Sequence, residues 1–244
     1  MKTSGYEPRL YRRSCQSEDL TPFSVVVKET DLFILAEKNL EEQAKKAVIS
    51  CRAALEEYIE RHPVFLTSLE PLPADDQASG IVSTMILAAQ KANVGPMAAV
   101  AGAVAEFVGR ELLNYCQQVI VENGGDIFLS STRKRLVRIF AGRSPFSNRI
   151  CLEIEPEHSP LGVCTSSGTV GHSLSFGQAD AVVIISPSAA LADAAATAIG
   201  NMVKTADDID QALAAAQMIE GVEGAVIIKD ERAGFWGKVK LRSG

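Results

Sequence analysis

The sequence predicts an α+β protein with a largely antiparallel sheet, and three observations support this class. Short β-rich runs occur in pairs separated by tight turns, which is typical of hairpins. Longer segments with apolar residues at helical spacing lie between these pairs. Hydrophobic residues make up 47% of the 244 residues, enough to bury a large core. We therefore expect a single domain over residues 1–244, made of two closely packed halves, and the sequence does not define the boundary between them.

The chain is predicted to begin with a hairpin followed by a long helix. Residues 23–28 and 32–36 are apolar runs on either side of a polar turn, so we expect them to pair as strands. Residues 39–60 carry apolar side chains at helical spacing with charges between them, and Asn39 is a suitable N-cap. This segment is therefore predicted to be an amphipathic helix.

Two further helices are predicted after a loop. Residues 70–80 collect prolines, acids and small residues, a composition typical of a loop. Residues 81–92 and 96–114 are rich in Ala, Val and Met, and Pro96 suits the first turn of the second helix. Their small side chains favour close packing against neighbouring elements.

The middle of the chain is predicted to be mainly strand. Residues 119–122 and 126–130 flank a Gly-Gly turn and should form a second hairpin. The Gly- and Ser-rich segment 162–177 has the composition of a functional loop. Further β-rich runs occupy residues 136–140, 150–154 and 181–186.

The last part of the chain combines two helices with a closing pair of strands. Residues 188–202 are predicted to be an Ala-rich helix, and residues 207–219 a further helix with acids at its N-terminus. Residues 224–229 and 235–241 are predicted strands around a polar turn. Because paired strands are adjacent in sequence, the sheet is expected to be antiparallel.

Composition and charge exclude several classes of function. The formal charge of −6 lacks the basic excess needed for a phosphate backbone, so no nucleic-acid partner is expected. The sequence has neither a membrane-length apolar stretch nor an apolar signal region, so we expect a cytoplasmic protein without membrane contact. The five cysteines lack CxxC spacing and are expected to be reduced thiols. The apolar Ala-rich helices would make a homo-oligomer interface easy to supply.

Asp193 and Thr197 are the first candidate site residues. They stand four positions apart in the segment ALADAAATAIGN and therefore share one face of the predicted helix. A carboxylate, a hydroxyl and nearby carbonyls suit magnesium, which prefers oxygen ligands. By pattern alone, the simpler interpretation is that Asp193 helps to cap its helix and Thr197 fills a polar helical position.

A glycine-rich turn and a glycine-rich loop supply further candidates. Gly124, Gly125 and Asp126 form a predicted turn in which the glycines would let a phosphate or a ring approach the backbone closely. The same sequence is also typical of a plain hairpin turn. The later loop offers backbone N–H groups and hydroxyls that would suit an anion. Its candidate ligand-binding residues are Thr165, Ser166, Ser167, Gly168 and Thr169.

The same loop contains two candidate catalytic residues. His172 could transfer a proton or bind the ligand. Cys164 could be an activated thiolate with His172 eight residues later. The commoner meaning of such a cysteine, at a strand end, is a small buried hydrophobe.

Three segments together resemble the ApbE family. The segments VIVENGGDIFL, CTSSGTVGHSLSFG and VVIISPSAALADAAATAIGN follow the family's order of a Gly-Gly-Asp hairpin, a Thr-Ser-Gly loop and a final Asp-Ala-x-x-Thr helix. The resemblance runs from about residue 80 to 240 and is closest to an uncharacterised branch from anaerobic bacteria and archaea. It implies an ApbE-like fold of two related antiparallel sheet-and-helix units resembling the tunnelling fold, with a small-molecule ligand between them.

The resemblance also implies roles for individual residues. In the ApbE flavin transferases the final helix helps to bind magnesium beside the FAD pyrophosphate. By matching position, the resemblance implies that Asp193 and Thr197 bind magnesium and that Asp126 lies near the nucleotide. The implied function is magnesium-assisted binding or transfer of a flavin or another nucleotide diphosphate, with magnesium and FAD as cofactors.

Departures from the family pattern keep a second function open. The family's flavin-binding Gly-Gly-Ile-Ala-Lys-Gly segment is replaced here by PMAAVAGAVAEFVG, which has no lysine. The alternative is an ApbE-like protein without flavin chemistry, because the resembling branch is thought to assist sulfur incorporation in homocysteine synthesis. Cys164 would then carry sulfur, or the chain would be a non-catalytic protein partner in sulfur metabolism.

Overall fold

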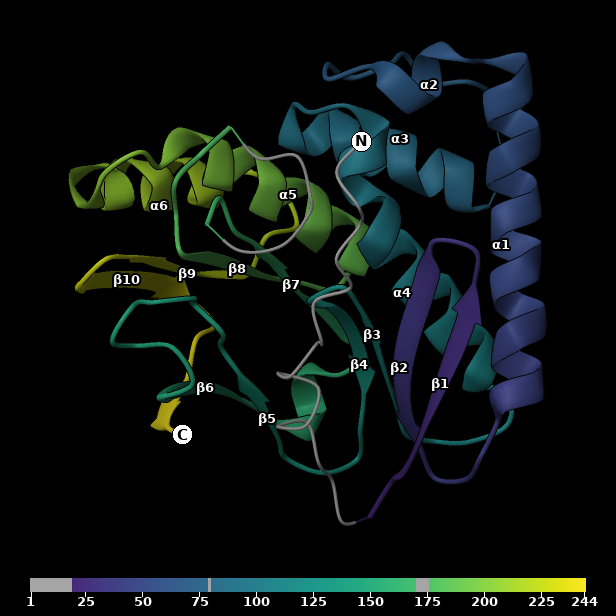
Figure 1. The fold of residues 1–244 in the computed structure, drawn as a ribbon, viewed down its shortest axis with the longest axis horizontal. Coiled ribbons are helices and arrows are strands. Elements are labelled where there is room, and N and C mark those ends of the chain that lie inside the picture. The colour runs from purple at the N-terminus through teal and green to yellow at the C-terminus, as the bar shows by residue number, and fades with distance from the viewer. Residues whose placement is uncertain (1–18, 79, 170–175) are drawn as a thin grey trace, which may run out of the picture.

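A computed structural model describes residues 19–78, 80–169 and 176–244 of the chain (Figure 1). In the first half of the described chain, two strands are followed by helices and then by two more strands. These elements are β1 (Thr21–Val27), β2 (Thr30–Ala36), α1 (Glu41–Arg61), α2 (Val64–Thr67), α3 (Ile81–Ala92), the 3₁₀ turn Pro96–Ala99, α4 (Val100–Leu112), β3 (Val119–Asn123) and β4 (Asp126–Ser130).

The second half repeats the order of strand pair, helices and strand pair. Its elements are β7 (Leu161–Ser166), β8 (Ala181–Ser186), α5 (Ala189–Met202), the 3₁₀ turn Ala206–Asp208, α6 (Ile209–Met218), β9 (Gly224–Lys229) and β10 (Arg232–Gly237). Between the halves and at the end of the chain lie β5 (Arg135–Arg138), β6 (Ile150–Ile154), the 3₁₀ turn Pro156–His158 and β11 (Leu241–Ser243).

Both halves contribute to one eight-stranded sheet. Its order is β1-β2-β3-β4-β7-β8-β9-β10, and its neighbouring strands pair antiparallel. The halves meet where β4 pairs with β7, with Ile127 opposite Val163. The predicted α+β class and the two related sheet-and-helix units are thereby confirmed.

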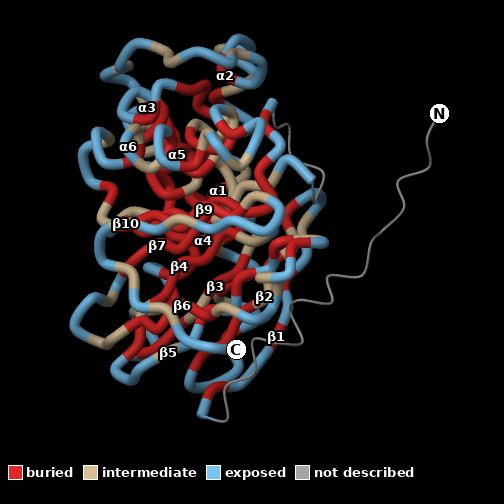
Figure 2. The backbone as a smooth tube through the Cα atoms, turned by 90° about the vertical axis from the view of Figure 1, so that its left-hand side faces the viewer, coloured by how far each residue is buried: buried red, intermediate tan, exposed pale blue. Residues whose placement is uncertain are grey.

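The two faces of this sheet are covered differently. Side chains of α1, α3, α4, α5 and α6 pack with one face of the strands into the larger core. The three-stranded sheet, in the order β11-β6-β5, packs on the opposite face of β4, β7, β8 and β9. Figure 2, coloured by residue burial, shows buried residues along these central strands and along the helices that cover them. The junction of the halves is therefore enclosed on both sides.

Three element predictions need correction. Residues 162–166 belong to strand β7 and not to a loop. The glycine at position 162 serves close packing on α5, because a Cβ there would come within 2.3 Å of the Cα of Ala189. The predicted strand 235–241 is divided between β10 and β11 in different sheets, with a positive φ of 80° at Gly237 ending the first. The helix predicted from residue 96 begins as a 3₁₀ turn.

The helical segments also bear on membrane association. In the described parts of the chain, no single helix is long and apolar enough to cross a membrane. The pair Ile81–Ala92 and Pro96–Leu112 has the combined length and composition, but its members are bent by 104° relative to each other. The expected cytoplasmic location stays a prediction.

Candidate functional site

The Gly-Gly turn places Asp126 at the junction of the two halves. Gly124 and Gly125 have φ values of +70° and +106°, a backbone conformation that glycine adopts without strain. The buried Glu122 side chain accepts a hydrogen bond from the Gly125 N–H at 2.7 Å. Asp126 is also buried, and its Oδ1 accepts a hydrogen bond from the Thr165 N–H at 3.2 Å. The structure therefore brings the Gly-Gly-Asp turn beside the end of β7.

Asp193 reaches this junction from α5. Its Oδ2 accepts a hydrogen bond from the Gly102 N–H at 2.8 Å. Gly102 lies in the first turn of α4, where backbone N–H groups are directed at partners outside the helix and the helix dipole favours a negative charge. The cap of its own helix is instead Ser188, whose side chain accepts from the Leu191 N–H. Asp193 therefore does not play the simple capping role within its own helix.

The pKa values of both aspartates are raised. Burial raises the pKa of Asp193 to about 7, although the N–H groups of Gly102 and Ala101 oppose the shift. Burial also raises the pKa of Asp126 well above its usual value, and the negative charges of Asp193 and Glu122 add to this. Burying carboxylates close together without a compensating cation is costly. The pair is therefore suited to a bound positive charge.

Thr197 lies one helical turn beyond Asp193 on the same face of α5, and both are partly buried. In the part of the chain that the structure describes, no three His, Cys, Asp or Glu side chains are grouped to hold a metal ion. An ion at Asp193 would need hydroxyl, carbonyl, water or phosphate oxygens as its other ligands. Such a ligand set is what magnesium accepts, so the residues present fit this ion.

The loop after β7 uses many of its polar groups internally. The Thr169 hydroxyl donates to Asp180 Oδ1 at 3.0 Å, and the Thr169 N–H donates to Ser167 Oγ at 3.2 Å. The Gly168 N–H donates to the Ala179 carbonyl at 2.9 Å. These three candidate ligand residues therefore serve to close the turn in this structure.

Thr165 and Ser166 are better placed to meet a ligand. Both are partly buried at the end of β7. Thr165 adjoins the Gly-Gly turn, since a Cβ on Gly125 would be 3.9 Å from the Thr165 carbonyl oxygen. Ser166 faces the later part of α5, where a Cβ on Gly200 would be 3.4 Å from its Oγ. His172 lies outside the described residues, so its predicted role stays a prediction.

Cys164 has the properties of a structural thiol. It is fully buried, and its Sγ donates to the Ala189 carbonyl at 3.3 Å. Burial and the negative charges of Asp126 and Asp193 raise the pKa of this thiol well above its usual value. A nucleophile or sulfur carrier needs an accessible thiolate. The geometry therefore favours the buried-hydrophobe interpretation of Cys164 and gives no support to the sulfur alternative.

Two features of the site were not anticipated from the sequence. The segment PMAAVAGAVAEFVG was predicted to be a closely packed helix that lacks the family's lysine, and no contact with the site was expected of it, yet its Gly102 N–H donates a hydrogen bond to Asp193. A side chain at Gly102 would overlap α5, because its Cβ would be 2.2 Å from the Ala189 carbonyl oxygen. A glycine within a predicted helix was the available signal for this close approach. Asn123 also contributes, donating from Nδ2 to the Ala101 carbonyl at 3.1 Å.

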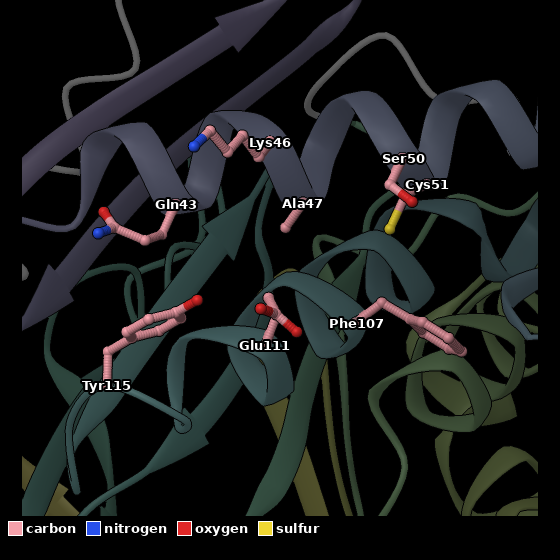
Figure 3. A pocket seen from close by; sticks show the side chains of 8 residues that line it. All are labelled: Gln43, Lys46, Ala47, Ser50, Cys51, Phe107, Glu111 and Tyr115. Atoms are coloured by element: carbon pink, nitrogen blue, oxygen red, sulfur yellow. The ribbon is translucent and has the colours of Figure 1, made fainter.

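A separate groove of about 440 Å³ lies between α1 and α4 (Figure 3). Its walls include Lys46 and Cys51 on α1 and Phe107 and Glu111 on α4. It contains none of the predicted site residues. The acid pair and the groove are therefore different places on the molecule.

Comparisons with known proteins find similarity over most of the chain. A family model described as "AbpE bacteria" matches residues 12–240. The UPF0280 protein of Methanococcus aeolicus is 44% identical over 201 residues, covering 80% of this chain and 81% of the relative. The UPF0280 protein of Methanosarcina acetivorans is 43% identical over 200 residues, covering 81% of this chain and 79% of the relative.

Solved structures of flavin transferases share the fold. The apo form of the Pseudomonas stutzeri flavinyl transferase ApbE matches with a TM-score of 0.59 and 14% identity, over 89% of this chain and 94% of that one. The flavin transferase ApbE of Vibrio cholerae matches with a TM-score of 0.59 and 12% identity, over 89% of this chain and 96% of that one. Identity at this level is informative about the fold, and the predicted ApbE-like fold is confirmed.

Proposed function

Since the chain belongs to the family described as "AbpE bacteria", within the ApbE-like superfamily, we propose that it binds a flavin or another nucleotide diphosphate with the help of magnesium. The observation that carries this proposal is the acid pair of Asp126 and Asp193. Burial raises the pKa of both, with mutual repulsion adding to the shift of Asp126, where the two halves of the sheet meet. A divalent cation would relieve this repulsion and favour both carboxylates in their charged form.

Each part of the site has a role in the proposal. Asp193 and Thr197 hold the ion from one face of α5, while Asp126 lies beside the nucleotide. Gly124 lies in open space, so the turn leaves room for a diphosphate to approach the backbone. Thr165, at the end of β7, positions the ligand.

Magnesium, when bound, would neutralise phosphate charge as the bond to AMP or its equivalent breaks. The chain's own residues bind and orient the ligand around that reaction. Asp193 must be deprotonated to bind a cation, and its pKa lies near 7. Affinity for magnesium should therefore increase as pH rises through about 7 and then level off.

The test is equilibrium binding of FAD, measured by flavin fluorescence at pH 8 with magnesium or with EDTA. We expect magnesium to tighten binding in the wild-type protein but not in Asp193→Ala. Thr197→Val, which keeps the shape of the side chain and loses the hydroxyl, should weaken the magnesium effect. Asp210→Ala, which removes an exposed carboxylate on α6, is the matched control and should bind like the wild type. Equal FAD affinity with and without magnesium in the wild type would refute the proposal.

A further inference from the structure

Helices α4 and α5 pack against each other, and each supplies a carboxylate to the beginning of the other. Glu106 of α4 accepts hydrogen bonds from the N–H groups of Ala189 at 2.7 Å and Ala190 at 3.3 Å, at the start of α5. Asp193 of α5 accepts from the Gly102 N–H of α4 at 2.8 Å. Glu106 follows Gly102 by four residues in α4, and Asp193 follows Ala189 by four residues in α5. The two helices are therefore joined by reciprocal caps.

Glu106 is held firmly in its own place. The Glu106 side chain is only 5% exposed, so protein groups rather than water must supply its hydrogen-bond partners. Oε2 also accepts from the Ser188 hydroxyl at 3.0 Å, and Oε1 accepts from Arg110 Nε at 2.9 Å. Hydrogen bonds to a charged group are stronger than those between neutral groups. A neutral side chain at this position would leave the start of α5 weakly bonded.

The crossing of the two helices couples this cap to Asp193. A Cβ on Gly102 would be 2.2 Å from the Ala189 carbonyl oxygen and 2.8 Å from the Asp193 Cβ. The backbones are therefore in direct contact between the two caps. Because Ala189 and Asp193 lie on one continuous helix, a shift of the first turn of α5 would move the Asp193 carboxylate as well.

We propose that Glu106 is a positioning residue for the magnesium site: by fixing the start of α5, it directs the Asp193 carboxylate. This inference rests on the function proposed above and names a residue that acts on the ion only through α5. Replacing groups that orient a metal ligand typically weakens metal affinity roughly 10- to 100-fold. Glu106→Gln keeps the size of the side chain and removes its charge, so it should produce a loss in this range.

The first measurement is amide hydrogen exchange in the magnesium-free protein, which is independent of any activity. Glu106→Gln should speed exchange at Ala189 and Ala190, whose N–H groups it contacts, and also at Gly102, whose N–H contacts Asp193. A purely structural cap would affect only the start of α5. Unchanged exchange at Gly102 would overturn the proposal.

The second measurement is magnesium affinity, taken from the magnesium dependence of FAD fluorescence well below the melting temperature. Glu111→Gln is the matched control, because it makes the same chemical change at an exposed position of the same helix. We expect Glu106→Gln to lose affinity roughly 10-fold or more and Glu111→Gln to stay within about twofold of the wild type. Equal affinities in both variants would overturn the role of Glu106, whereas no magnesium effect in the wild type would overturn the proposed function itself.

A milder variant covers the case in which Glu106→Gln fails to fold. Ser188→Ala removes one donor to Glu106 and the N-cap oxygen of α5. It should speed exchange at Gly102 and weaken magnesium binding in the same direction by a smaller factor. An unchanged Gly102 amide together with faster exchange at Ala190 would count against the coupling.

Discussion

Replacing Asp193 with asparagine should remove much of the pH dependence of unfolding from the magnesium-free protein. The pKa of Asp193 rises from its usual 3.8 to about 7 on folding, mainly because the group is buried. Between these values the folded chain holds a proton that the unfolded chain has lost. The free energy of unfolding therefore falls as pH rises from about 4 to about 7 and is flat above that range.

The size of the effect follows from the shift. Each pKa unit corresponds to about 1.36 kcal/mol, so Asp193 should lower the free energy of unfolding by about 3 kcal/mol between pH 5 and pH 8. Asp126, whose pKa is also raised, adds a fall of the same sign. Removing the Asp193 charge lowers the pKa of Asp126 and weakens that part as well.

The assay is urea unfolding followed by circular dichroism at several pH values between 5 and 8, with EDTA present. The wild-type curve should fall relative to that of Asp193→Asn by about 3 kcal/mol across this range. Asp210→Asn, at an exposed position of α6, should keep the wild-type slope. Parallel curves for wild type and Asp193→Asn would show that the carboxylate ionises normally and would refute the electrostatic argument for the site.

Two further predictions concern the packing of individual residues. Gly102→Ala should destabilise the protein by about 3 kcal/mol, because its Cβ would overlap the backbone of α5. In Gly124→Ala the new Cβ meets open space, so this variant should lose only about 1 kcal/mol through backbone strain. Urea unfolding measures both variants, and equal losses of stability would contradict the close crossing of α4 and α5. In native protein at pH 8, a thiol reagent should modify the partly buried Cys116 well before the fully buried Cys164, as mass spectrometry of the labelled peptides would show. Early modification of Cys164 would contradict its structural role.

Much of the fold follows from local sequence pattern. Alternating and continuous apolar runs predicted the hairpins β1–β2 and β3–β4, because side chains on a pleated strand point to opposite faces. Helical spacing predicted α1, α3, α5 and α6 to within a few residues. For strand β7, the sequence indicated only a strand end at Cys164 and otherwise a loop from residue 162. The strand is rich in Gly, Thr and Ser near its ends, so composition favoured a loop where sheet pairing determined the structure.

The expectation of an oligomer interface from Ala-rich helices shows the same limit. The alanines of α5 from Ala189 to Ala196 are buried inside the chain itself, against the sheet and neighbouring helices. Small apolar side chains indicate close packing, and the sequence does not say against which surface. The expected homo-oligomer stays a prediction.

For the site, the sequence by itself determined which groups are available: the Gly-Gly-Asp turn, the Thr-Ser-Gly segment and the Asp193–Thr197 face of one helix. Only the tertiary structure decided which of them meet. Pairing of β4 with β7 brought Asp126 to Thr165, and the crossing of α4 and α5 gave Asp193 the Gly102 amide and gave α5 the Glu106 carboxylate. These contacts join residues far apart in the chain, and their energies depend on burial, which no local pattern contains.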